Sequence, residues 1–135
     1  MTKNPGSDIG PKTLIARKYP LPGGGEGTDL YLTKSGVETA FAGDVPRRHA
    51  DQMWAEQRPF SQEAFDSVSD EPAWKTIPSW YFVATQDHAI PPATRRFMAN
   101  RAHAKVSQVK SSHAPMISQP AATTKVILAA AKAIG

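Results

Sequence analysis

The stretch IPSWYFVATQDHAIPP, residues 77–92, decides the fold class of this 135-residue chain. Its middle, from Ser79 to Thr85, is a short run of aromatic and β-branched residues that lies between a proline and a polar turn. Such a run is typical of a strand buried on both faces. Pro91 and Pro92 then favour a helix start, because proline fits the first helical turn. The stretch predicts a central strand followed by a helix.

The following residues extend this pattern to a β-α-β-α unit. We expect the helix to run to about His103, residues 105–109 alternate as a second strand, and Pro120 starts a last helix that ends at Ile134. A helix that connects two consecutive strands in this way implies that the strands are parallel. The predicted fold class is α/β.

The N-terminal residues 1–27 are rich in residues that interrupt regular structure. They contain Pro5, Pro11, Pro20 and Pro22 and the run Gly23-Gly24-Gly25. This density predicts an irregular loop segment over 1–27. A glycine run can bind phosphate, but here no strand pattern precedes it and no Gly-Lys-Ser/Thr follows it, so a flexible loop is favoured.

The sequence pattern over residues 28–73 predicts small helices joined by irregular connections. Asp44 stands where the N-cap of an amphipathic helix would be, and that helix carries Ala50, Met53, Trp54 and Gln57 on one face. Ser61 is the expected cap of a second short helix, with Ala64 and Phe65 facing inward.

Composition excludes several function classes. The net charge of +4 comes from scattered Lys and Arg, with adjacent pairs at Arg47-Arg48 and Arg95-Arg96 but no basic stripe, so no nucleic-acid partner is expected. The absence of cysteine rules out thiolate nucleophiles and disulfides and permits a cytoplasmic setting. No apolar stretch approaches the roughly 20 residues of a membrane span, and no signal pattern is visible, so we expect a soluble cytoplasmic protein without a membrane partner. Four scattered histidines give no metal pattern, and we expect no metal and no cofactor.

Two polar residues follow the two predicted parallel strands. Asp87 comes directly after the first strand, and His113 comes shortly after residues 105–109. The carboxyl ends of parallel strands meet at one edge of a sheet, so both side chains should lie there together. A carboxylate in that position can bond one imidazole nitrogen and leave the other free to act as a base.

Residues 77–92 and the stretch SSHAPM, residues 111–116, resemble the esterase-like α/β-hydrolases, near the methylesterase and hydroxynitrile-lyase branch. The resemblance implies that Asp87 is the acid and His113 the general base of a catalytic triad. It implies that residues 74–135 are the C-terminal part of the hydrolase core with an incomplete sheet, and that residues 28–73 are a mobile cap. Trp54 on the cap helix and Ile90 after Asp87 would then contact substrate, although a packing role remains open for both.

The sequence departs from this family at the nucleophile. The family's serine lies in a G-x-S-x-G elbow, and no serine of this chain has that setting. We therefore expect a serine hydrolase of small, largely apolar carboxylic esters that lacks its nucleophile, so that the isolated chain is inactive.

Two alternatives stay open. The same fold supports lyase and acyl-transfer chemistry. A truncated or pseudo-enzyme remnant would instead act as a non-catalytic interaction module, and we expect self-association through the exposed edge of its small sheet.

Overall fold

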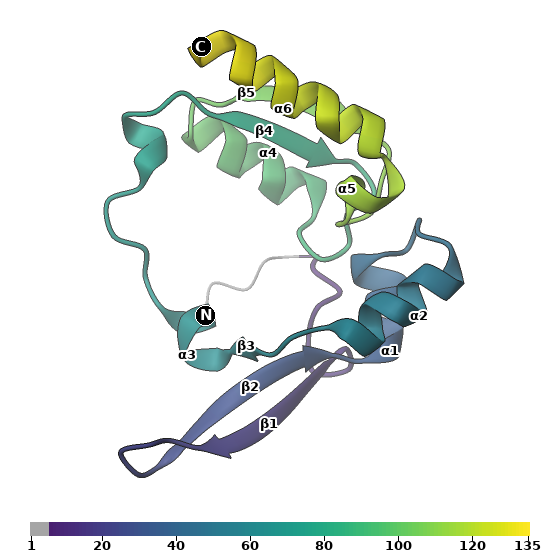
Figure 1. Cartoon of the computed structure of the whole chain (residues 1–135), viewed down its shortest axis with the longest axis vertical. Coiled ribbons are helices and arrows are strands. Elements are labelled where there is room, and N and C mark those ends of the chain that lie inside the picture. The colour runs from purple at the N-terminus through teal and green to yellow at the C-terminus, as the bar shows by residue number, and fades with distance from the viewer. Residues whose placement is uncertain (1–5) are drawn as a thin grey trace.

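The computed structural model describes residues 6–135 and contains two small sheets (Figure 1). The strands are β1 (Leu14–Pro20), β2 (Glu26–Leu32), β3 (Phe60–Ser61), β4 (Trp80–Ala84) and β5 (Lys105–Val109). The helices are α1 (Lys34–Gly36), the π-helix η1 (Val37–Phe41), α2 (Arg47–Glu56), α3 (Gln62–Asp66), the 3-10 helix η2 (Ala73–Lys75), α4 (Pro92–Arg101), α5 (Pro115–Ser118) and α6 (Pro120–Ile134). Within residues 6–135, none of the helices combines the length and apolarity needed to cross a membrane.

The C-terminal half forms the predicted β-α-β-α unit. Strand β4 pairs in parallel with β5, from Trp80 opposite Lys105 to Ala84 opposite Val109. Helices α4 and α6 both contact β4, and Figure 1 shows the two-stranded sheet lying between them. The predicted α/β class, the parallel pairing and the helix starts at the two proline positions are confirmed.

Burial of β4 is less complete than predicted. Val83 and Ala84 are fully buried, but Trp80, Tyr81 and Phe82 are half-buried. The prediction of burial on both faces is wrong for these three because, in the described residues, this sheet has only two strands. The ammonium group of Lys105 lies 4.9 Å from the centre of the Trp80 ring and covers part of it.

The predicted irregular segment over residues 1–27 is wrong where β1 forms. Strand β1 pairs antiparallel with β2, from Leu14 opposite Leu32 to Pro20 opposite Glu26. Pro20 is tolerated because it is the last residue of an edge strand. Gly24 and Gly25 have φ angles of 89° and 86° and make the reversal between the strands, a backbone region that glycine enters without strain. The part of the prediction that falls on residues 1–5 lies outside the described residues.

Helix α2 carries the buried face of residues 28–73. Ala50 is buried in a cluster with Val37, Ala42 and Val45, and Met53 packs against this cluster. Trp54, predicted on the same face, is 38% exposed. The N-cap is Pro46 rather than the predicted Asp44, whose carboxylate bonds a distant segment instead.

Helix α3 begins where the sequence predicts but is not buried. The hydroxyl of Ser61 accepts a hydrogen bond from the backbone N–H of Ala64. Ala64 and Phe65 are nevertheless exposed, so their predicted inward orientation is wrong. Phe65 instead makes an edge contact with Phe60.

Candidate active site

Asp87 and His113 meet at the carboxyl edge of the parallel sheet, as predicted. Oδ2 of Asp87 lies 2.9 Å from Nδ1 of His113. The Asp87 side chain is fully buried, whereas the His113 side chain is 23% exposed. Nε2 of His113 has no hydrogen-bond partner among residues 6–135. When Nδ1 carries the ring's N–H, Nε2 is therefore free to accept a proton.

The backbone holds the two loops together beyond the ends of the strands. The N–H of Thr85 donates to the carbonyl of Val109 at 2.9 Å, and the N–H of Gln86 donates to the carbonyl of Ser111 at 3.0 Å. The parallel ladder thus continues into both loops. This continuation delivers Asp87 and His113 to the same place.

The second carboxylate oxygen of Asp87 is bound by its own loop. Oδ1 accepts the backbone N–H groups of Ala89 and Ile90, both at 2.8 Å, which closes a turn around the side chain. Burial by itself would raise the pKa of Asp87, but hydrogen bonds from His113 and Ile90 and the nearby charge of Arg95 outweigh it. The pKa of Asp87 is therefore below its ordinary value. Asp87 stays ionised at neutral pH and can orient the imidazole.

Arg95 is a third member of this cluster. Its guanidinium forms an ion pair with Oδ2 of Asp87, and its Nη2 lies 3.0 Å from Nδ1 of His113. The side chain is 12% exposed. Sequence reasoning missed Arg95 and treated the Arg95-Arg96 pair as scattered charge. Its position in the first turn of α4, directly after the loop of Asp87, was a usable signal.

Phe41 and Asp44, from the segment between β2 and α2, contact the histidine loop. The ring of Phe41 lies 4.8 Å from the ring of His113, centre to centre, at a tilt of 44°. The hydroxyl of Ser112 donates a hydrogen bond to the carboxylate of Asp44. Burial by itself would raise the pKa of Asp44, but the hydrogen bonds from Ser112 outweigh this effect. The pKa of Asp44 therefore lies below its ordinary value. Sequence reasoning missed these contacts because they join segments far apart in the chain.

The order of strands, the Asp87–His113 contact and the comparison with known families all indicate the same family. The sequence model of a family described as the alpha/beta hydrolase family matches residues 4–126. The chain belongs to the α/β-hydrolase family.

Solved structures show how much of the α/β-hydrolase fold is present. The crystal structure of polyneuridine aldehyde esterase matches with a TM-score of 0.74 and 17% identity, over 86% of this chain and 48% of that one. A histidine-to-alanine mutant of that esterase matches with a TM-score of 0.72 and 16% identity over the same shares. No curated protein matches. The chain spans about half the length of these structures and has a partial α/β-hydrolase fold.

The two predicted substrate contacts lie in different places in this α/β-hydrolase chain. Ile90 is half-buried beside Asp87 and contributes its backbone N–H. Trp54 lines a cavity of about 430 Å³ where the hairpin meets α2, together with Ile15, Arg17, Tyr31, Leu32, Ala55 and Gln57. Neither Asp87 nor His113 lines this cavity, so the structure brings Ile90, but not Trp54, to the acid-base pair.

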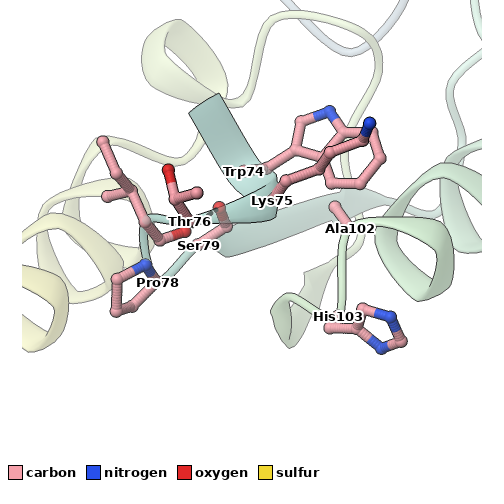
Figure 2. Close-up of a pocket in the computed structure, with 8 residues that line it drawn as sticks. Trp74, Lys75, Thr76, Pro78, Ser79, Ala102 and His103 are labelled. Carbon is pink, nitrogen blue, oxygen red and sulfur yellow. Dashed lines mark hydrogen bonds between the residues drawn. The ribbon is translucent and has the colours of Figure 1, made fainter. Parts of the chain in front are cut away.

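A second cavity of about 430 Å³ lies at the opposite edge of the sheet. Figure 2 shows that Trp74 to Ser79 come from the segment leading into β4, and that Ala102 and His103 come from the turn before β5. These residues precede the parallel strands, whereas Asp87 and His113 follow them. The cavity is therefore separate from the acid-base pair.

The hydroxyls of the two serines next to His113 form hydrogen bonds with groups other than the His113 ring. Ser111 and Ser112 are buried, and the hydroxyl of Ser111 donates to the carbonyl of Ser112 at 3.1 Å, while Ser112 bonds Asp44. In the part of the chain that the structure describes, no serine hydroxyl bonds the His113 ring, and no three acidic or histidine side chains gather as a metal site.

Proposed function

We propose that this chain supplies the acid and the base of a serine carboxylesterase, with Asp87 orienting His113 and His113 acting as general base. The hydrogen bond between Asp87 Oδ2 and His113 Nδ1, with Nε2 left free, carries this proposal. The esterase named among the similar structures supports an ester as the substrate class. The proposed substrate is a small, largely apolar carboxylic ester.

The proposed chemistry needs a nucleophile that the printed sequence does not contain in its usual setting. A serine from a G-x-S-x-G segment would give its hydroxyl proton to Nε2 of His113 while its oxygen attacks the ester carbonyl. The imidazolium would return that proton to the leaving alcohol. Water, deprotonated by Nε2, would then release the acid from the acyl-serine. Asp87 holds the ring in the required tautomer throughout.

The cap segment would close the site from the side of η1. Phe41 packs on the base, and we propose that Ile90 contacts the apolar part of the ester from the loop of Asp87, whereas Trp54 lines a separate cavity. The cytoplasmic setting expected from the cysteine-free sequence stays a prediction.

An ester assay tests this function. The 135-residue chain should hydrolyse a p-nitrophenyl ester at the background rate, and a fusion to a segment that carries the elbow serine should be active. In the fusion, His113→Ala should abolish turnover and Asp87→Asn should lower it by about 10⁴-fold. His88→Ala is the matched control, because His88 is exposed and bonds Asp8 instead.

Two results of that assay would contradict the proposal. An inactive but folded fusion would remove the esterase function, and product analysis of an active one separates hydrolysis from lyase or acyl-transfer chemistry. Hydrolysis by the chain alone that depends on His113 would show that one of its own serines is the nucleophile, and Ser111 and Ser112 would be substituted first.

A second candidate function is non-catalytic. The β4–β5 sheet has two strands, and in the described residues its outer edges have no partner strand. Val106 on β5 is 51% exposed. Unpaired edges with apolar side chains favour pairing with another chain. We propose self-association through this sheet as the interaction of a chain that lacks a nucleophile.

A further inference from the structure

Arg95 and His113 share one oxygen of Asp87. Oδ2 lies 2.9 Å from Nδ1 of His113 and accepts from two nitrogens of the Arg95 guanidinium, while Oδ1 is already bound by two backbone N–H groups. Because Arg95 is only 12% exposed, little water screens its charge from the ring. The acid of the pair is therefore shared between the base and a fixed cation.

The same geometry gives Nδ1 of His113 two possible hydrogen-bond partners, of which a neutral ring can bond only one at a time. It lies 2.9 Å from an acceptor, Oδ2 of Asp87, and 3.0 Å from a donor, Nη2 of Arg95. A neutral imidazole carries one N–H. If Nδ1 carries it, the ring donates to Asp87 and Nε2 is a free base. If Nε2 carries it, Nδ1 accepts from Arg95 and the ring has no base facing outward.

We propose that Arg95 is a positioning residue that opposes the productive tautomer of His113. The inference rests on the proposed function, in which the productive form has its proton on Nδ1. Arg95 favours the other form in two ways: it offers a donor to Nδ1, and it occupies the oxygen that the Nδ1 proton needs. Arg95 thus restrains the base without touching substrate.

Helix α4 sets this position and also provides a matched control. The N–H of Arg95 bonds the carbonyl of Pro91 at 3.1 Å, which fixes Arg95 in the first turn beside Asp87. Arg96, the next residue, is exposed and reaches Gln108 on β5 at 3.5 Å. The two arginines carry the same charge on the same helix, but only Arg95 contacts the acid-base pair.

The test reads the tautomer of His113 directly. The chain labelled with ¹⁵N-histidine contains four histidines, and His113→Ala identifies the signals of His113 by their loss. Arg95→Gln should raise the ratio of the Nδ1–H to the Nε2–H form by about tenfold, the change expected from losing one hydrogen bond to a charged group. Arg96→Gln should leave the ratio unchanged.

Two outcomes would overturn the inference: an unchanged ratio in a folded Arg95→Gln chain, or an equal change in Arg96→Gln. If Arg95→Gln does not fold by circular dichroism, Arg95→Lys replaces it. Lysine keeps the charge but loses the planar donors that span Asp87 and His113. It should raise the ratio in the same direction, and an unchanged ratio would again refute the role.

The fusion with an elbow serine separates this inference from the proposed function. There Arg95→Gln should raise kcat several-fold with little change in KM, because it increases the share of active base. An inactive fusion together with a shifted tautomer ratio would refute the esterase function and keep the effect of Arg95 on the ring. An active fusion with an unshifted ratio would refute the role of Arg95 alone.

Discussion

Both oxygens of Asp87 are occupied by donors, so the fold stabilises its charge and depends on it in return. Five contacts converge on this carboxylate: two backbone N–H groups, two nitrogens of Arg95 and one of His113. An amide in its place removes the negative charge and leaves the guanidinium of Arg95 buried without a counter-ion. Asp87 therefore has a structural role beside its proposed role in orienting His113.

The first prediction concerns this buried charge. Asp87→Asn should lower the free energy of unfolding at pH 7 by about 3 kcal/mol, the usual cost of removing one partner of a buried ion pair. The shift in the urea midpoint of tryptophan fluorescence measures it. Asp66→Asn is the control, because Asp66 is exposed and its carboxylate bonds Gln62 on its own helix. Equal shifts in both variants would contradict the prediction.

The second prediction is the pH dependence of that difference. The pKa of Asp87 is lowered below 3.8 in the folded chain, so the unfolded chain takes up the proton first as the pH falls. The contribution of Asp87 is thus complete above the ordinary aspartate value and is lost as the pH falls through the lower, folded-state value. The urea midpoints of the parent and Asp87→Asn should converge below about pH 3.8. A gap of constant size from pH 7 to pH 3 would rule this out.

The sequence indicated Asp87 and His113 but not their neighbours. Each of these two follows a strand whose pattern is local and clear, and parallel pairing then brings them together. Arg95 faces them only because α4 packs beside the same edge, and Phe41 and Asp44 reach the histidine loop from a segment some 70 residues earlier in sequence. Contacts of this second kind depend on the tertiary arrangement, which periodicity does not encode.

At the scale of elements, the hairpin shows where prolines and glycines are a poor guide to irregular structure. Residues 14–19 contain neither proline nor glycine. The prolines and glycines of this region lie at the end of β1 and in the reversal that follows. Proline and glycine there mark the limits of strands rather than the absence of strands. The starts of α4 and α6 were predictable because a proline stands at each of them, and β5 was predictable from its alternation, whereas the short helix α5 was not predicted.

The third prediction tests the junction between this hairpin and α1. A Cβ at Gly36 would lie 2.7 Å from the carbonyl oxygen of Thr13, which also accepts the N–H of Thr33. Gly36→Ala should lower the free energy of unfolding by about 1 to 3 kcal/mol, as overpacking against backbone does. Gly23→Ala, where a Cβ meets nothing within 4 Å, should change it by less than about 0.5 kcal/mol. Urea midpoints measure both, and a Gly36→Ala chain as stable as the parent would contradict the prediction.

At the scale of the whole molecule, the core is thin. The buried apolar residues are alanines and valines, whereas Phe97, Ile127 and Leu128 are more than half exposed. Helix α6 has no buried residue along its 15 positions. Small side chains contribute little burial, and an exposed apolar surface of this kind favours association.

The fourth prediction follows from that surface. The purified chain should bind a hydrophobic dye and form larger species as its concentration rises, measured by sedimentation velocity. Val106→Lys should weaken the association, because it puts a charge in place of an exposed apolar side chain on β5. Gln108→Lys adds the same charge on the same strand without removing apolar surface and should weaken it less. A monomer at every concentration that binds no dye would refute self-association.

The hydrogen bond between Ser112 and Asp44 joins the segment that carries Phe41 to the loop that carries His113. Phe41 rests on the ring three residues before Asp44, so this part of the chain touches His113 from one side and is tied to its neighbour on the other. Lifting that segment to admit a molecule would strain or break the tie and remove the support of the imidazole. If His113 is the general base that we propose, substrate entry and proton transfer would then occur at different times, because the open conformation would leave the imidazole unsupported.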